Sequence, residues 1–267
     1  MPPALARNRR RLTLDVATST NEVALEAGRA GDPGPLWVTA RRQSGGRGRR
    51  GRAWVSEEGN LYASLMLVDP ASMADIANLP LVAALGVRNA VARLVPNGET
   101  RVAVKWPNDV LIDGAKAVGI LLESDVSGPA PVVVIGCGIN VAFVPADLPY
   151  RASGIVDAGG GADLETVFAA LASSMDEALA LFARGAGFAQ VRAAWLSHAV
   201  GLGRPCRVNL AETSVDGRFE GLDERGRLIL TMKDGARRTI SAGDLFFPEP
   251  ERGAGASAVL LPAGFET

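Results

Sequence analysis

The chain has 267 residues, of which 48% are hydrophobic and 21% charged, enough for one large domain or a large domain followed by a small one. Its net charge of −1 argues against nucleic-acid binding, and no apolar run has the length of a membrane helix or a signal-peptide core, so we expect a cytoplasmic protein with neither partner. Cys137 and Cys206 lie far apart without C-x-x-C spacing, which predicts two buried thiols in a reducing compartment.

The N-terminal part of the chain predicts a short arm, a strand and a helix. Residues 1–11 are basic and indicate a flexible arm, and residues 12–15 favour a short strand. The sequence from Ser19 to Glu22 has the spacing of a capping box ahead of a helix over residues 22–29. On this pattern alone, Ser19, Thr20 and Asn21 are first interpreted as the helix cap.

Residues 43–52 form a decapeptide, QSGGRGRRGR, with four glycines and four arginines between strands predicted at 36–40 and 61–68. Glycines let the backbone approach a ligand closely, and each arginine offers a rigid fork of donors to a carboxylate or phosphate. A flexible basic linker has the same composition. The position between two core strands favours a lid that wraps an anionic ligand.

Two nucleotide motifs are excluded for this loop. Gly46, Gly48 and Gly51 fit G-x-G-x-x-G, but a strand over residues 61–68 follows, whereas the dinucleotide fingerprint opens a helix. A P-loop would need Gly-Lys-Ser or Gly-Lys-Thr after its glycines, and the decapeptide has neither. The loop is therefore a phosphate-binding candidate of another kind.

The middle of the chain predicts a core helix over residues 77–94 and then a hairpin of two strands, 101–112 and 115–123. The Asp-Gly pair at 113–114 is typical of a two-residue hairpin turn, which would pair Leu111 with Lys116 and Asp109 with Val118. Asp109 and Lys116 would then be diagonal neighbours on one face. Pro107 removes a ladder donor and indicates an edge or a bulge.

The rest of the chain divides into two textures. A strand at 132–141 and amphipathic helices at 164–183 and 188–196 complete a first domain over residues 12–200, with His198 in a structural role at the end of the second helix. Short strands at 205–210, 217–222, 227–232 and 237–240, with turns at 215–217, 224–226 and 233–235, predict a small barrel over 201–247. Residues 248–267 predict a disordered tail.

Lysine is scarce, since Lys105, Lys116 and Lys233 are the lysines among 28 basic residues. An exposed hairpin lysine is the plain interpretation of Lys116, but this scarcity favours a role that arginine cannot fill. Beside Asp109, Lys116 could pair with oxygens that gain charge during displacement at a phosphate. Asp109 could orient that lysine, help to place magnesium or activate an acceptor amine.

Four motifs together resemble the biotin protein ligases, in order and spacing, over residues 19–245. They are GRGRRGR with Trp54, then KWPND at 105–109, KAVGILLE at 116–123 and GCGINV at 136–141. The resemblance implies an α+β catalytic domain of class II synthetase type, on a mixed and largely antiparallel sheet with flanking helices, plus an SH3-like barrel. It also implies that biotin and ATP give biotinyl-5′-AMP and pyrophosphate, after which biotin passes to a lysine of a biotin carboxyl carrier domain.

The resemblance assigns roles by matching position. Catalytic roles go to Lys116, which would bridge the biotin carboxylate and the α-phosphate, to Asp109 beside it and to Arg49, which would retain the adenylate. The residues expected to bind biotin are Ser19, Thr20, Gln43, Gly46, Arg47, Lys116, Gly119 and Gly138. Those expected to bind ATP or the adenylate are Arg47, Arg49, Arg50, Trp54, Asn108, Lys116 and Asn140. Trp54 either stacks on adenine or belongs to the core.

The expected cofactors are ATP and Mg²⁺, with the ion carried by the phosphates near Asn108 and Asp109 rather than held in a dedicated site. The acceptor would be the carrier protein of acetyl-CoA carboxylase or a related carboxylase. The oligomeric state stays open, with a homodimer among the options. Catalytic motifs begin close to the first residue, so the helix-turn-helix repressor domain of many bacterial members is not expected. A lipoate ligase or octanoyl transferase of the same fold is the alternative, and a non-enzymatic regulatory protein is a more distant one.

Overall fold

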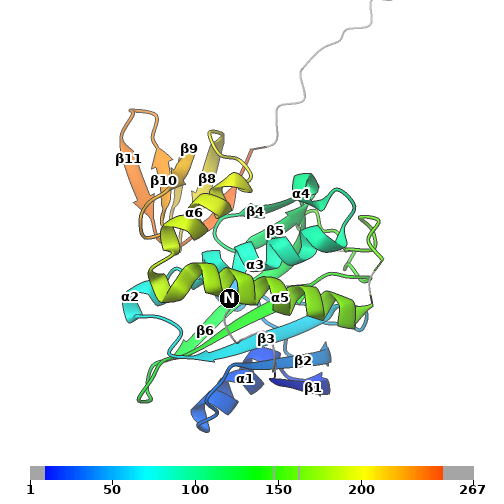
Figure 1. Cartoon of the computed structure of the whole chain (residues 1–267). Helices are drawn as coiled ribbons and strands as arrows, with labels where there is room; N and C mark the ends of the chain where they lie inside the picture. Colours follow the sequence, from blue (N-terminus) through cyan, green and yellow to red (C-terminus); the bar gives the residue numbers. More distant parts are fainter. Residues whose placement is uncertain (1–9, 147, 162, 249–267) are drawn as a thin grey trace, which may run out of the picture.

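The computed structural model describes residues 10–146, 148–161 and 163–248, which form two β-sheets with helices packed on the larger one (Figure 1). The larger sheet has seven strands in the order β1-β2-β3-β7-β6-β5-β4, and the smaller has five in the order β11-β10-β9-β8-β12. The expected mixed α+β fold with a small C-terminal β-domain is confirmed. Residues 1–9 of the expected arm and residues 249–267 of the expected tail lie outside the described residues.

One parallel pair and five antiparallel pairs build the larger sheet. β1 (Arg10–Ala17) runs parallel to β2 (Leu36–Gln43), and every other neighbouring pair is antiparallel. The remaining strands are β3 (Leu61–Val68), β4 (Val102–Lys105), β5 (Asp109–Ile112), β6 (Ala115–Asp125) and β7 (Val132–Ile139). β1 begins at Arg10, so the last two residues of the expected arm belong to the sheet.

The two faces of this sheet are covered differently. α3 (Leu79–Leu94) and α5 (Leu164–Phe182) pack together over one face, and α6 (Phe188–Ser197) contacts both of them and β9. α1 (Thr20–Arg29) covers part of the opposite face (Figure 1). Because side chains alternate along a strand, Leu61, Ala63 and Leu65 enter the core under α3 and α5. Ser64 faces the α1 side, where it bonds to that helix.

α5 is a core helix of this layer. The segment Leu164–Gly185 is long and apolar enough to cross a membrane by length and composition. In the fold, however, Val167, Leu171 and Met175 are fully buried against the sheet and α3. Short helical turns connect the other elements: α2 (Met73–Ile76), α4 (Gly98–Arg101), η2 (Arg49–Gly51) and η3 (Ala183–Gly185).

The smaller sheet consists of β8 (Pro205–Asn209), β9 (Ser214–Leu222), β10 (Leu228–Thr231), β11 (Arg237–Ile240) and β12 (Asp244–Phe246). All of its pairs are antiparallel, and Val208, Phe219 and Leu230 are buried between its strands and α6. The turn expected at residues 215–217 is wrong, because these residues lie inside β9. The turns expected near 224–226 and 233–235 are present.

The strand expected over residues 101–112 is also wrong in detail. It is a hairpin in which β4 and β5 are joined by a turn at 106–108, so Lys105 pairs with Asp109. The Asp-Gly turn holds Leu111 opposite Lys116 as predicted, but a bulge then shifts the register and pairs Asp109 with Gly119 instead of Val118. Asp109 and Lys116 nevertheless lie next to each other, as predicted.

α1 begins two residues earlier than expected, at Thr20. Ser19 occupies the N-cap position, yet its side chain makes no capping hydrogen bond. The capping-box interpretation is therefore wrong. Thr20 and Asn21 are instead buried against the sheet, where their side chains bond to residues of β2, β3 and β6.

Candidate active site

A cavity of about 670 Å³ opens on the sheet face opposite α3 and α5. This volume lies within the ~300–1,000 Å³ typical of small-molecule sites. Eleven of the fourteen residues expected to bind or react line it: Ser19, Thr20, Gln43, Arg47, Arg49, Trp54, Asn108, Asp109, Lys116, Gly119 and Gly138. Gly46, Arg50 and Asn140 are the three that do not.

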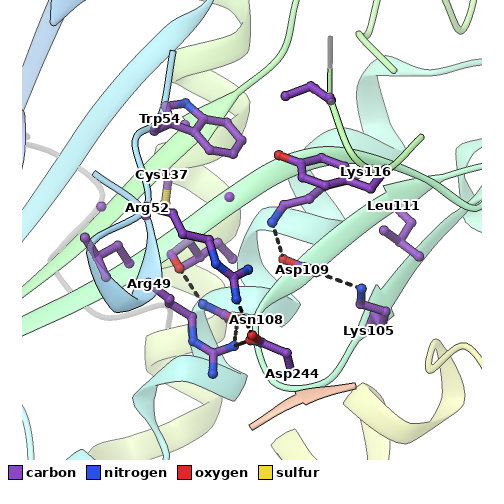
Figure 2. Close-up of a pocket in the computed structure, with 18 of the residues that line it drawn as sticks. Arg49, Arg52, Trp54, Lys105, Asn108, Asp109, Leu111, Lys116, Cys137 and Asp244 are labelled. Atoms are coloured by element: carbon purple, nitrogen blue, oxygen red, sulfur yellow. Dashed lines mark hydrogen bonds and ion pairs between the residues drawn. The ribbon is translucent and has the colours of Figure 1, made fainter. Parts of the chain in front are cut away.

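A lysine–aspartate–lysine cluster lies at the β4–β5–β6 end of the cavity (Figure 2). Asp109 Oδ1 is 2.6 Å from Lys116 Nζ, and its Oδ2 is 3.1 Å from Lys105 Nζ. Burial raises the pKa of Asp109, but the charges and hydrogen bonds of the two lysines outweigh burial and hold that pKa below its usual range. One carboxylate between two ammonium groups leaves a net positive charge facing the cavity.

Two aromatic rings flank Lys116. Its Nζ lies 5.7 Å from the ring centroid of Trp54 and 5.4 Å from that of Tyr150, within the range of cation–π attraction. Tyr150 is carried by the segment after β7, which is tied to β6 because Lys116 N donates to Arg151 O at 2.8 Å. The reactive end of the cavity therefore combines positive charge with two flat apolar faces.

The paired glycines of β6 and β7 make room for the Trp54 ring. Gly119 and Gly138 lie opposite each other in the ladder. A Cβ added at Gly119 would be 2.7 Å from Trp54 Cζ3, and one at Gly138 would be 2.4 Å from Trp54 Nε1. Trp54 is half-buried and outside the hydrophobic core clusters, and its indole N–H is buried without a hydrogen-bond partner. The ring is thus a wall of the cavity rather than a core side chain.

A buried polar network forms the α1 end of the cavity. The Gln43 side-chain oxygen accepts from Thr20 N at 2.8 Å and from Thr20 Oγ1 at 3.1 Å, while Gln43 Nε2 donates to Ser56 Oγ. Asn21 Nδ2 donates to Glu123 Oε2 at 2.8 Å. The Asn21 amide lies so close to the β7 backbone that a Cβ at Gly136 would be 2.1 Å from its Oδ1. These groups can hold a small polar ring system.

The decapeptide over residues 43–52, called the Gly/Arg loop from here on, crosses the open side of the cavity. Arg47 Nη2 reaches Glu123 Oε1 at 3.5 Å, next to the polar network. Arg49 Nη1 donates to Asn108 Oδ1 at 3.0 Å, and its Nη2 donates to Gly243 O at 2.8 Å. Gly46 lies at the base of the loop, where its carbonyl accepts from Trp54 N, and a Cβ there would be 2.5 Å from Ser56 Oγ.

The two asparagines have separate tasks. Asn108 is buried, its Oδ1 accepts from Arg49 and its Nδ2 donates to Ile120 O, so it fastens the loop to the β5–β6 hairpin. Asn140 Nδ2 donates to Ser153 O at 3.4 Å, and Ile155 N donates to Asn140 O. Asn140 thereby supports the segment that carries Tyr150 instead of lining the cavity.

Cys137 and His198 take the structural roles expected of them. Cys137 and Cys206 are both free and buried, and burial raises the pKa of the Cys137 thiol to about 12. His198 caps the C-terminal end of α6, and its carbonyl accepts from Val104 N at the outer edge of β4. Burial lowers the pKa of His198.

Four functional positions were missed from the sequence. Asp244 on β12 faces the arginines of the loop, and Glu123 faces Arg47 and Asn21. Lys105 completes the lysine cluster, and Tyr150 supplies the second aromatic face. The scarcity of lysine was a usable signal for Lys105, whereas no local pattern marks Asp244 or Tyr150.

The arrangement suits a ligand with an apolar or polar ring at one end and phosphate at the other. Lys105, Lys116, Arg47, Arg49 and Arg52 line the cavity against Asp109 and Asp244, although the whole chain has a net charge of −1. Among the described residues, no group of three or more His, Cys, Asp or Glu could hold a metal ion. The cations that line the cavity suit electrostatic stabilisation of a phosphate or acyl phosphate.

Two family models match the chain. Residues 14–140 match the biotin/lipoate A/B protein ligase family, and residues 201–247 match the biotin protein ligase C-terminal domain. The second match covers the five strands of the smaller sheet.

Similar proteins and structures agree with these matches. A biotin–[acetyl-CoA-carboxylase] ligase of Paracoccus denitrificans is 40% identical, over 86% of this chain and 97% of the relative. A bifunctional ligase/repressor BirA of Bacillus subtilis is 32% identical, over 85% of this chain and 71% of the relative. The structure of a biotin protein ligase from Aquifex aeolicus in complex with biotin and ATP is 28% identical, with a TM-score of 0.77 over 90% of this chain and 99% of that one. The chain belongs to the biotin protein ligase family.

Proposed function

We propose that the cavity beneath the Gly/Arg loop holds biotin at the α1 end and the nucleotide at the lysine end. As a biotin ligase, the chain forms biotinyl-5′-AMP from biotin and ATP and transfers biotin to a protein lysine. The observation that carries the residue assignment is the Lys116–Asp109 pair, which lines a cavity together with three arginines of the loop, Arg47, Arg49 and Arg52. No feature of the cavity favours lipoate.

In the first step, a carboxylate oxygen of biotin attacks the α-phosphorus of ATP, and pyrophosphate leaves with the electron pair of the broken P–O bond. Lys116 Nζ lies on the net-positive cluster and neutralises charge on the attacking carboxylate and on the α-phosphate oxygens. Lys105 shares Asp109 with Lys116 and adds a second positive charge at this end. The transition state gains more from these charges than the separate substrates do.

In the second step, the neutral amine of the acceptor lysine attacks the acyl carbon of biotinyl-5′-AMP and an amide forms. The bond from the acyl carbon to the phosphate oxygen breaks, AMP leaves with its electron pair, and the amine proton passes to solvent. Asp109 orients Lys116 rather than accepting the proton of that amine. The reason is that a carboxylate whose pKa is held below its usual range is a weak base near neutral pH. The two lysines occupy both of its oxygens as well.

The biotin ring system is assigned to Ser19, Thr20, Gln43, Gly119 and Gly138, with Gly46 and Arg47 at the loop above it. Asn21 and Glu123 join this set because they belong to the same buried network. The adenylate is assigned to Arg49, Arg50, Asn108 and Trp54, and Asn140 acts through the segment that carries Tyr150. The flat, half-buried indole is suited to stacking on adenine.

Magnesium is proposed to enter with the phosphates of ATP, near Asn108 and Asp109. A dedicated protein site does not fit the described residues, because both oxygens of Asp109 already face lysines. When bound, the ion would neutralise charge on the phosphates.

The acceptor is proposed to be the biotin carboxyl carrier protein of acetyl-CoA carboxylase, or of a related carboxylase, in the cytoplasm. The Paracoccus relative carries that acceptor enzyme in its name. We also propose that residues 12–200 form the catalytic domain and residues 201–247 an SH3-like domain. A homodimer is the assembly proposed for the chain.

Incubation with ATP, labelled biotin and a purified carrier domain tests this function. Label should appear on the carrier lysine and should require ATP. A carrier that stays unlabelled with biotin but is modified with lipoate would overturn the substrate assignment.

A further inference from the structure

Three arginines of the Gly/Arg loop converge on one carboxylate of the C-terminal sheet. Asp244 Oδ1 lies 3.5 Å from Arg49 Nη1, and its Oδ2 lies 3.2 Å from Arg50 Nη1 and 2.5 Å from Arg52 Nη2. Figure 2 shows the side chains of Arg49 and Arg52 directed towards Asp244. These contacts are distant in sequence, because Arg50 and Asp244 are 194 positions apart.

Backbone carbonyls of the same sheet strengthen the attachment. Arg49 Nη2 donates to Gly243 O at 2.8 Å, and Arg50 Nη2 donates to Asn209 O at 3.3 Å. Gly243 precedes β12 and Asn209 ends β8, and these two strands are paired through Asp244 and Asn209. The loop between β2 and β3 is thus fastened to one end of the C-terminal sheet.

The geometry implies that the arginines need a counter-charge to stay together. Guanidinium groups within four residues of sequence repel one another. Burial lowers the pKa of Arg49, the charges of Asp244 and Asp109 oppose that change, and the charges of Arg50 and Arg52 add to it. The Asp244 side chain is only 13% exposed, so solvent screens these pairs less than it would screen ordinary surface pairs.

One carboxylate does not neutralise three guanidinium groups. The cluster keeps an excess of positive charge, and Arg49, Arg52 and Asp244 all line the cavity. Asp244 can therefore gather the arginines without cancelling their attraction for phosphate.

We propose that Asp244 is a positioning residue by which the C-terminal domain holds the arginines of the loop in place over the nucleotide. This inference rests on the proposed function, because it assigns the phosphates to that end of the cavity. It makes the C-terminal sheet part of the device that retains the nucleotide and the adenylate.

If Asp244 acted only through its own negative charge, removing it would change nucleotide affinity in the opposite direction. If the carboxylate only opposed the phosphates, its removal would tighten nucleotide binding. If it positions the arginines, its removal releases the loop and weakens binding. The direction of the change in ATP affinity therefore separates the two.

The test compares Asp244→Asn with the wild type and with Glu220→Gln. Glu220 is an apt control because it also pairs with an arginine of the C-terminal sheet, Arg237, but lies outside the cavity. In biotin-dependent ATP–pyrophosphate exchange, Asp244→Asn should raise the KM for ATP about tenfold and change kcat little, as expected for loss of charge-assisted hydrogen bonds. Trypsin should also cut ligand-free Asp244→Asn about tenfold faster than the ligand-free wild type, at the arginines within residues 47–52.

An unchanged or lower KM for ATP, together with unchanged cleavage, would overturn the proposal. Asp244→Glu should restore most of the ATP affinity, since it keeps the charge. If Asp244→Asn does not fold, Arg52→Ala combined with Asp244→Glu still tests the contact, because independent effects of the two changes on cleavage would contradict it. Absence of exchange in the wild type would refute the proposed function instead, whereas the cleavage comparison would still report on Asp244.

Discussion

The β5–β6 hairpin and the Gly/Arg loop both bring cations to the cavity, but they are held in different ways. Lys116 and Asp109 lie on adjacent paired strands, seven residues apart in sequence, and their side chains are 22% and 18% exposed. Arg49, Arg50 and Arg52 lie on a loop, are 27–63% exposed, and depend on Asp244 in the other sheet.

This difference separates two tasks. A rigid pair on a strand ladder can stabilise charge that develops during reaction, because it needs no rearrangement at that moment. A loop attached to a second sheet by side-chain ion pairs can open and close without breaking a strand ladder, because its arginines are themselves partly exposed. The account therefore assigns bond making to the hairpin and retention of the adenylate to the loop.

The largest effect should come from Lys116→Ala. Adenylate formation should fall by about 10²–10³-fold, in line with loss of one donor to developing charge, while the protein keeps its fold. Pyrophosphate release and circular dichroism measure the two properties. Lys233→Ala is the matched control, because Lys233 is exposed and outside the cavity. Normal turnover in Lys116→Ala would remove the hairpin from the chemistry.

Asp109→Asn should destabilise the protein by about 2 kcal/mol at pH 7, or roughly 30-fold in the folding equilibrium, because two lysines lose their partner. The pKa of Asp109 is lower in the folded state than in the unfolded state. Its contribution to the free energy of unfolding is therefore fully present above the pKa that Asp109 has in the unfolded state. That contribution is lost as the pH falls through the folded-state pKa. The free energies of unfolding of variant and wild type, measured in urea, should therefore converge in acid. A difference that stays constant down to acidic pH would show that the ion pairs of Asp109 are not its cause.

Gly138→Ala should reduce retention of biotinyl-5′-AMP by about tenfold, a loss of the size expected when one aromatic contact is displaced. The new Cβ would be 2.4 Å from Trp54 Nε1, and moving Trp54 disturbs the base of the loop, where Trp54 N bonds to Gly46 O. Dissociation of labelled adenylate measures the effect. Gly221→Ala is the control, since a Cβ there meets no atom within 4 Å. Equal retention in both variants would show that Trp54 does not contact the adenylate.

Local patterns in the sequence predicted most of the fold and the reactive pair. The Asp-Gly turn predicted the hairpin, and alternation along the ladder brought Asp109 and Lys116 together despite a bulge that no residue pattern announces. The strand at Leu61–Val68 agrees with its predicted bounds. These features depend on neighbours in sequence, and such neighbours are visible in a single chain.

What the sequence could not predict depends on tertiary contacts. Asp244 meets the loop only because the C-terminal sheet packs beside the cavity, and an aspartate at the start of a short strand has no distinguishing pattern. Thr20 and Asn21 had the spacing of a cap, but burial against β2, β3 and β6 directs their side chains to the sheet. Asn140 was expected at the ligand, yet it supports the backbone of the segment next to it.

The most direct test of the account is the partition of biotinyl-5′-AMP in Arg49→Gly. Arg49 joins the loop to Asn108, Gly243 and Asp244, so its removal should leave adenylate formation within a few-fold of wild type but release the adenylate about tenfold faster. Labelled biotin on lysines of a bystander protein, relative to label on the carrier domain, measures this release. At saturating ATP, where a change in the KM for ATP does not limit adenylate formation, the account predicts strong bystander labelling. A variant as selective as wild type, or one that loses adenylate formation as Lys116→Ala does, would contradict the division between hairpin and loop.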